Sequence, residues 1–351
     1  MSFSKVPAES KSKIKKAGQI LIESNPDTIE LTWARDLANR WRACHAYPIN
    51  TFQSTLRSKL RAYSKDAIVA QRLKRMPTII DKLKRYPSMQ LTTMQDIGGI
   101  RVVLRSLPEV KKLVNEYKKN SRFIHELVDE NNYIENPRSE DGYRSWHLIY
   151  KYRNKRNPDY DGLRLELQIR TRLQHLWATA VETMGTFLGQ ALKSRQGEQE
   201  WLDFFALTSA AFAHQEKTPP IPRFSNLTPM GTLAAVAIAE SRLGALEKMS
   251  GISVAIQLIQ KKPSAGEGGA YHLIVLNSLE KTVKVRAYAK EKFNQAMADY
   301  SAIEKEVVEG KKLEPVLVSA GPIGNLRKAF PNFFLDINDF TQKVRNLVSP
   351  K

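Results

Sequence analysis

The sequence predicts an α/β fold, more narrowly α+β, in which a mixed sheet is flanked by helices and a small α+β domain follows. Three observations support this. Residues 163–170 alternate leucine or isoleucine with polar residues, as a half-buried strand does. Helical patterns surround this strand, one of them over residues 173–192. Four prolines between residues 217 and 230 forbid a helix there and indicate a linker.

The N-terminal part, residues 1–217, is predicted to be rich in helices before the sheet begins. Helical patterns with start signals cover residues 11–22, 28–45, 49–63 and 77–85. Residues 97–104 and 145–152 are β-branched or aromatic and read as strands. The strand at 163–170 buries Leu163, Leu165, Leu167 and Ile169 and presents the opposite face of Arg164, Glu166, Gln168 and Arg170.

After a linker at residues 218–230, a second domain is predicted over residues 231–351. Its elements are a helix, three antiparallel strands, another helix and a last strand, at residues 231–249, 253–259, 271–279, 282–289, 290–308 and 315–319. Helices packed around strands again indicate an α+β arrangement.

Charge is the most informative bulk property. The chain has 55 basic and 36 acidic residues, a net of +19. Eighteen basic and 12 acidic residues follow Lys217, which leaves 37 basic and 24 acidic before it, a net of +13. This excess favours a polyanionic partner such as nucleic acid over a solubility charge alone.

Other bulk properties narrow the setting. No apolar run approaches the roughly 18–20 residues of a membrane span, and no apolar segment of a signal peptide follows the basic N-terminus. Cys44 is the one cysteine, so a cysteine-based zinc site is excluded. We expect a cytoplasmic protein whose metal, if it uses one, is a hard cation on oxygen ligands.

Two carboxylates suggest such a cation site. Asp96 precedes Gly98-Gly99 at a predicted strand, where backbone can approach a ligand closely, and Glu166 lies on the polar face of the leucine-backed strand. Carboxylates on a basic sheet surface suit Mg²⁺, which leaves coordination positions for phosphates. Tyr143 offers a ring to a nucleotide base. The arginines beside the carboxylates would neutralise charge in phosphoryl transfer: Arg101, Arg105, Arg164 and Arg170.

Each of these features alone also has an ordinary structural reading. Arginine and glutamate on a strand usually form cross-strand ion pairs in solvent, His175 could be a hydrogen-bonded structural histidine, and Tyr143 could be part of the core. The sequence has no GxxxxGK[ST] motif, which excludes a P-loop enzyme.

Three segments together resemble the synthetase domain of the RelA/SpoT family, which makes the alarmones ppGpp and pppGpp. They are DIGGIR at 96–101, EDGYRSWH at 140–147 and ELQIRTRLQHLWATAVE at 166–182, with RLKRMPTIIDKLKR upstream at 72–85. The resemblance covers about residues 54–192. It implies a nucleotidyltransferase-like mixed sheet and an ATP pyrophosphokinase, in which a 3′-hydroxyl attacks the β-phosphate of ATP and AMP leaves.

The resemblance also implies residue roles. Asp96 and Glu166 would hold Mg²⁺, with Glu166 drawing the proton from the attacking hydroxyl. Arg72 and Arg101 would flank the adenine of ATP, and Lys74, Lys82 and Arg85 would meet its phosphates. Tyr143 would stack on the acceptor base. The remaining residues of the catalytic and acceptor pocket would be Gln168, His175, Arg144, His147, Arg170, Lys151 and Arg153.

Departures from the family pattern bear on the acceptor. No His-Asp pair of a hydrolase domain occurs, and NPRSEDGYRSWH at 136–147 replaces the usual acceptor loop. The added C-terminal domain resembles the CapRel-type fused toxin–antitoxin synthetases, which modify the 3′ CCA end of tRNA. That likeness rests on architecture and on FPNFFLD at 330–336. It implies a zinc-free, zinc-finger-like domain that blocks the ATP site, here through Phe330 and Phe333, until a phage protein such as a capsid protein releases it.

Three hypotheses follow. The first is a tRNA-modifying toxin in phage defence with a built-in inhibitor, which uses both the basic charge and the C-terminal domain. The second is a small alarmone synthetase acting on GDP or GTP. The third is a catalytically inactive RNA-binding protein on the same scaffold. Basic clusters at Lys111-Lys112, Lys118-Lys119 and residues 151–156 favour the first, and retention of both carboxylates disfavours the third.

Overall fold

The computed structural model of the chain describes residues 3–23, 27–119, 123–187, 199–246, 249, 270–277, 280, 282–311, 313–319 and 337–348. Within these residues eight strands form one sheet in the order β3-β4-β5-β2-β1-β8-β6-β7. The strands β2 and β5 pair in parallel, and the other neighbours pair antiparallel. The mixed α/β sheet that the sequence predicts is therefore confirmed.

The elements have the following bounds. The strands are β1 (Ile68–Leu73), β2 (Gly98–Leu104), β3 (Glu126–Asn132), β4 (Trp146–Lys151), β5 (Arg164–Thr171), β6 (Tyr271–Asn277), β7 (Thr282–Tyr288) and β8 (Leu313–Ser319). The α-helices are α1 (Lys11–Ile20), α2 (Thr28–Cys44), α3 (Ala46–Leu60), α4 (Met76–Arg85), α5 (Leu107–Lys119), α6 (Arg172–Phe187), α7 (Gln199–Glu216), α8 (Pro229–Leu243), α10 (Phe293–Val308) and α12 (Asn338–Val348).

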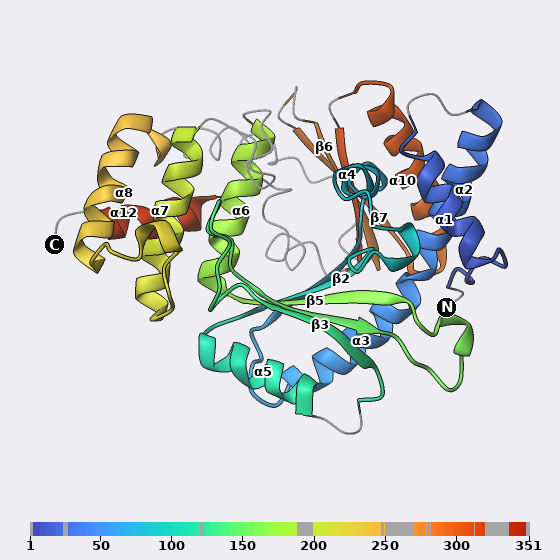
Figure 1. Ribbon diagram of the computed structural model, residues 1–351, viewed down its shortest axis with the longest axis horizontal. Coiled ribbons are helices and arrows are strands. Elements are labelled where there is room, and N and C mark those ends of the chain that lie inside the picture. The colour runs from blue at the N-terminus through green and yellow to red at the C-terminus, as the bar shows by residue number, and fades with distance from the viewer. Residues whose placement is uncertain are drawn as a thin grey trace.

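Helices α3 and α5 cover the apolar face of the strands β1–β5 (Figure 1). This face is the leucine side of β5, and all four of its predicted core residues are at most 3% exposed: Leu163, Leu165, Leu167 and Ile169. On this face, α3 approaches β2 closely at Gly98, since a Cβ at this position would come within 3.0 Å of Ile49 on α3. The opposite, polar face of the same strands is left to carry the site.

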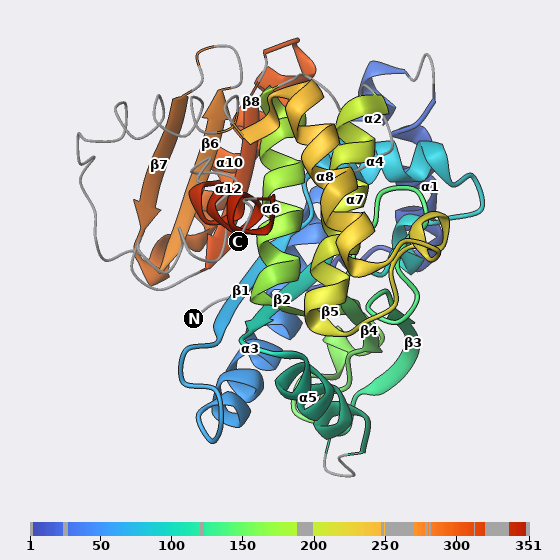
Figure 2. The same cartoon turned by 90° about the vertical axis from the view of Figure 1, so that its left-hand side faces the viewer.

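Elements after residue 217 join the N-terminal part in two places. Strand β8 pairs with β1, so that β6, β7 and β8 extend the sheet, with α10 packed on β6 and β8. Helices α8 and α12 instead pack against α6 and α7 (Figure 2), on the opposite side of the molecule from α10 in Figure 1. The boundaries at residues 217 and 231 stay a prediction, while β8, α8, α10 and α12 contact N-terminal elements.

Several predicted elements need correction. Helix α3 begins at Ala46, so Pro48 lies inside its first turn, where proline costs no hydrogen bond. Helix α8 ends at Leu243 and not at Met249, because Gly244 adopts the left-handed conformation with φ 62°. The strands β1 and β3 and the helices α5 and α7 were absent from the sequence prediction. The predicted strand 253–259 and the predicted plug residues Phe330 and Phe333 lie outside the described residues.

Candidate active site

Strand register brings the polar residues of β2, β4 and β5 to one level of the sheet. In the parallel pair, Gly99 lies opposite Glu166 and Arg101 opposite Gln168. In the antiparallel pair, His147 on β4 lies on the other side of Gln168. Because residues two apart on a strand share a face, Glu166, Gln168 and Arg170 all project from the face that α3 and α5 leave open.

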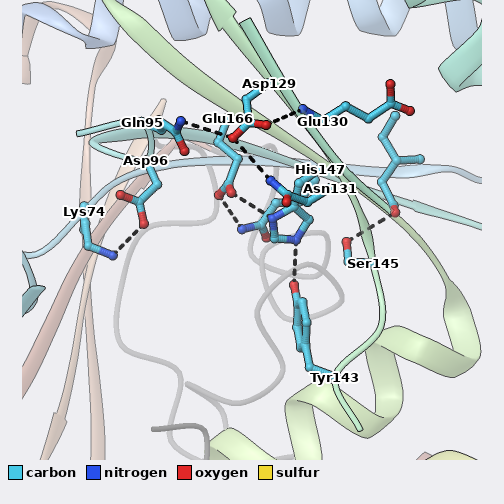
Figure 3. Close-up of polar contacts among 12 residues, drawn as sticks. Lys74, Gln95, Asp96, Asp129, Glu130, Asn131, Tyr143, Ser145, His147 and Glu166 are labelled. Atoms are coloured by element: carbon cyan, nitrogen blue, oxygen red, sulfur yellow. Dashed lines mark hydrogen bonds and ion pairs between the residues drawn. The ribbon is translucent and has the colours of Figure 1, made fainter. Parts of the chain in front are cut away.

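Asp96, just before β2, accepts two ion pairs. Lys74 Nζ lies 2.9 Å from Oδ2 and Lys82 Nζ lies 3.0 Å from Oδ1. Burial alone would raise the pKa of the Asp96 carboxyl, but the two ammonium groups outweigh it and hold that pKa well below its usual range. Burial lowers the pKa of Lys74, although the neighbouring Asp96 carboxylate favours the charged ammonium. Asp96 is therefore an anion at neutral pH with two cations beside it, of which Figure 3 draws Lys74.

Glu166 is paired with a histidine. Its Oε1 lies 2.8 Å from His147 Nδ1, and its Oε2 accepts a 2.7 Å hydrogen bond from Gln168 Nε2. Burial alone would lower the pKa of His147, but its contacts with Tyr143 and Glu166 raise that pKa to about 9. Burial would raise the pKa of Glu166, yet His147 and Gln168 keep it below the ordinary value. At neutral pH the two form a buried imidazolium–carboxylate pair.

Three arginines gather around this pair. Arg101 and Arg170 are buried, and each lies within electrostatic reach of Arg72 and of Glu182 on α6. Burial, together with the like charge of Arg170, lowers the pKa of Arg101 to about 9. His175, at the start of α6, hydrogen bonds through Nδ1 to Arg170 Nη2. The predicted catalytic residue His175 therefore contacts the site through Arg170. The three arginines make this side of the site strongly positive.

Tyr143 closes one end of the site. Its hydroxyl is 3.0 Å from His147 Nε2, and its side chain is 9% exposed. The guanidinium of Arg138 lies 4.7 Å from the ring centroid, so one face of the ring that is predicted to stack on the acceptor is occupied by a cation. Gly142, with φ 77°, permits the turn that places Tyr143 here.

The structure does not bring every predicted site residue to this cluster. Arg144 is buried and donates to Ile134, Ser209, Thr218 and Pro219, which anchors α7 and the segment after it. Lys151 and Arg153, at the far end of β4, both pair with Glu126 at 3.0 Å.

Other basic side chains are engaged in the same way. Arg85 pairs with Asp81 within α4, and Arg105, which lies beyond the end of β2, pairs with Asp66 instead of joining the polar face. Lys111 and Lys118 pair with Glu135 and Glu130.

Sequence reasoning missed residues that β3 contributes. Asp129 accepts a 3.3 Å hydrogen bond from Gln95 Nε2, and Asn131 lies opposite His147 in the register. Asp129 lies opposite Ile149, which lies opposite Glu166, so that β4 stands between these residues and Glu166 in the sheet of Figure 3. Strand β3 reads ELVDENN and lacks apolar alternation, so only pairing with β4 could have revealed these residues.

A small, partly open pocket joins the two carboxylates to the arginines. Its lining comes from β1, β2, β5 and the residues before β2, and includes Arg72, Lys74, Asp96, Gly99, Arg101, Glu166 and Gln168. Among the described residues no group of three or more histidine, cysteine, aspartate or glutamate side chains could hold a metal. The donor set still fits Mg²⁺, which takes one or two carboxylates and completes its shell with water and phosphate oxygens. Asp96 and Glu166 are the residues that would hold it.

The fold and this pocket define an α/β domain with an acidic pair set among arginines and lysines on an open sheet face. Residues 71–185 match the family described as "Region found in RelA / SpoT proteins". The chain therefore carries a RelA/SpoT region, and the resemblance seen in the motifs is confirmed.

Similar proteins cover part of the chain. "GTP pyrophosphokinase YjbM" of Bacillus subtilis (strain 168) is 31% identical over 113 residues, 32% of this chain and 52% of that protein. "GTP pyrophosphokinase YwaC" of the same strain is 29% identical over 114 residues, 31% of this chain and 52% of that protein. The chain thus spans about half the length of these curated relatives.

Among solved structures, the "small alarmone synthethase 1 from Bacillus subtilis bound to its product pppGpp" has 23% identity and a TM-score of 0.42. The match covers 53% of this chain and 93% of that one. Among the described residues no helix is both long and apolar enough to cross a membrane.

Proposed function

We propose that the protein transfers the β,γ-pyrophosphate of ATP to a 3′-hydroxyl group. The observation that carries the proposal is the pair of carboxylates, Asp96 and Glu166, on a sheet face lined by lysines and buried arginines within the RelA/SpoT region. Phosphoryl transfer needs positioning and charge neutralisation more than covalent chemistry, and these side chains supply both.

Each side chain has a defined task in this reaction. When ATP binds, its phosphates displace Asp96 from Lys74 and Lys82. Arg72 and Arg101, which line the pocket, flank the adenine of ATP. The acceptor oxygen attacks the β-phosphorus, the bond from that phosphorus to the α–β bridging oxygen breaks, and AMP leaves. Glu166 takes the hydroxyl proton. Mg²⁺ bound by the freed Asp96 and by Glu166 would neutralise charge on the phosphates.

For the acceptor we favour a guanine nucleotide. Two relatives that match over this region are named GTP pyrophosphokinases. In addition, three of the basic residues expected to hold a large polyanion already pair with acids: Lys151 and Arg153 with Glu126, and Lys118 with Glu130. Each of these pairs must open before its cation can bind a phosphate, at a cost of up to about 1 kcal/mol.

The 3′ end of tRNA is the second candidate acceptor, and the net charge of +19 favours it. A tRNA acceptor would make the protein a translation-blocking toxin. Inhibition by Phe330 and Phe333 and release by a phage protein would belong to that second function, and both remain predictions.

One labelling experiment tests the reaction and its acceptor together. ATP carrying a labelled γ-phosphate is incubated with the protein and GDP, GTP or bulk tRNA, and products are separated by size and charge. We expect label on the guanine nucleotide, and release of AMP in equal amount. Label on tRNA alone would replace the first acceptor with the second. No AMP with any acceptor would contradict pyrophosphoryl transfer itself.

A further inference from the structure

A buried ion pair connects two helices that are 262 residues apart in sequence. Arg42 on α2 donates from Nη1 to both carboxylate oxygens of Glu304 on α10, at 3.1 and 3.0 Å. Arg42 is fully buried and Glu304 is 6% exposed. Tyr300, one turn before Glu304, places its ring 4.5 Å from the Arg42 guanidinium. A charge pair this deep is costly to desolvate and requires further hydrogen bonds to be stable.

The further hydrogen bond goes to the start of α4. Glu304 Oε1 also accepts from the backbone N–H of Met76, the first residue of α4, at 2.6 Å. The residue before it, Arg75, makes no side-chain cap. The first N–H groups of a helix lack partners within the helix, and a carboxylate there also interacts favourably with the helix dipole. Glu304 therefore acts as the cap of α4, supplied from the C-terminal part of the chain.

Helix α4 and the residue pair before it carry the cations of the ATP site. Lys82 lies on α4 and Lys74 two residues before it, and the two hold the opposite oxygens of Asp96. The strand β1, which leads into this segment, also contacts the C-terminal part of the chain, because the backbone of Arg72 on β1 lies opposite that of Val318 on β8. The segment from Arg72 to Met76, which includes Lys74 and leads into α4, is thus held at both ends by residues after 290.

We propose that Glu304 is a positioning residue for ATP: by capping α4 at Met76, it sets Lys74 and Lys82 for the phosphates. This inference rests on the proposed pyrophosphokinase function. It assigns to α10 a supporting role in nucleotide binding and makes an N-terminal site depend on a C-terminal side chain.

Two double variants isolate the cap from the ion pair. Arg42→Met/Glu304→Gln removes both charges and keeps an oxygen that accepts from Met76. Arg42→Met/Glu304→Met removes the charges and the acceptor, with a side chain of similar size. Replacing both partners avoids leaving a buried charge unpaired, so both variants are expected to fold.

The readout is the dissociation constant of a non-hydrolysable ATP analogue, with thermal unfolding measured alongside. We expect the Gln variant to bind within about twofold of wild type and the Met variant roughly three- to tenfold more weakly, as loss of a helix cap implies. The KM of the acceptor should stay the same in both. Asp299→Asn is the matched control and should bind like wild type, because Asp299 lies half-buried on α10 and its partners, Arg286 and Tyr288, are on β7, away from α4.

Equal affinity of the two folded double variants would overturn the inference. Hydrogen exchange on the wild-type protein provides a test without any variant: the analogue should slow exchange in α4 and in the segment around Glu304 together. Protection of α4 alone would also overturn it. If wild type does not bind the analogue at all, the proposed function fails first, so the two failures are distinguishable.

Discussion

His147 and Glu166 show how burial changes the work of two ordinary side chains. Both project from neighbouring strands into the same pocket, and the 2.8 Å contact makes each the counter-charge of the other. The counter-charges of the Asp96 carboxylate are the ammonium groups of Lys74 and Lys82. Both carboxylates are therefore kept ionised before any phosphate arrives, which is the state that a metal ligand or a general base needs.

The His147–Glu166 pair predicts a pH-dependent stability. The pKa of His147 rises from 6.5 to about 9 on folding, so its contribution is complete below pH 6.5 and is lost as the pH rises towards 9. Wild type should thus lose up to roughly 3 kcal/mol of unfolding free energy relative to His147→Gln across this window. Urea unfolding of both proteins at pH 6, 7, 8 and 9 measures the difference. Parallel curves would show that His147 is neutral in the folded protein.

Glu166→Gln should lower kcat by about a hundred- to ten-thousandfold, because the variant removes a proton acceptor and a metal ligand while keeping the shape of the side chain. The measurement is AMP release at saturating ATP and acceptor, with circular dichroism to confirm the fold. Glu130→Gln is the matched control, since Glu130 on β3 bonds Trp146 on β4 and Lys118 on α5, outside the pocket. Near-normal turnover in a folded Glu166→Gln protein would refute the assignment.

At the scale of elements, the loop before β4 depends on close contact with α7. A Cβ on Gly142 would come within 2.8 Å of Ser209 Cβ, and the backbone there has φ 77°. Ser209 Oγ also donates to Gly142 O at 2.5 Å and accepts from Arg144 at 3.1 Å. The glycine therefore allows α7 to approach the loop that carries Tyr143.

Gly142→Ala should destabilise the protein by about 1–3 kcal/mol through overpacking and backbone strain. It should also reduce transfer, because Tyr143 moves with the loop. In a Ser209→Gly background the same substitution should cost less, since the clash is gone and only the strain remains. A double-mutant cycle of unfolding free energies measures this coupling. Strict additivity would mean that Ser209 does not limit the approach.

The elements that the sequence revealed are those with a strong pattern of their own. The strand at 163–170 and the amphipathic helix after it could be assigned because apolar residues recur with one clear period. Strand β3, with its polar sequence, and the short β1 carry no such pattern and depend on their neighbours.

The same distinction applies to the site. Asp96 and Glu166 stood out by residue type, and the structure brings both to one pocket. Their partners depend on register and could not be read from the sequence: His147 reaches Glu166 only because β4 pairs with β5 so that His147 lies opposite Gln168. Arg144 shares a motif with Tyr143 but turns to α7, since alternate residues of an extended segment point to opposite sides.

On the scale of the whole molecule, charge separates the two acceptors. If tRNA is the acceptor, Lys151→Glu/Arg153→Glu should weaken tRNA binding, and the slope of log affinity against log salt should flatten by roughly 0.7–0.9 per lost phosphate contact. The affinity for ATP should hardly change, because both residues lie at the far end of β4. Filter binding over a salt series makes the measurement. An unchanged slope would show that Lys151 and Arg153 contact no phosphate.

The C-terminal part is joined to the rest of the molecule by more than a linker. Phe340 on α12 lies 6.0 Å from Phe205 and 5.9 Å from Phe212, between ring centroids, in the core shared with α7. On the other side, β8 pairs with β1 and Glu304 pairs with Arg42. Residues 1–217 therefore complete two of their buried surfaces with residues from beyond the linker.

Truncation after Lys217 tests what these contacts contribute. It exposes the aromatic face of α7, uncovers Arg42 by removing Glu304 and Tyr300, and removes the cap of α4. Since domains have only about 5–15 kcal/mol of stability, the fragment should unfold at a much lower temperature and lose transfer activity. The resemblance to fused toxin–antitoxin proteins predicts the opposite, a constitutively active fragment. Thermal unfolding and AMP release of the fragment and the full chain, measured side by side, decide between them. A stable fragment with higher kcat would favour inhibition, and it would show that the contacts with α10, α12 and β8 are dispensable.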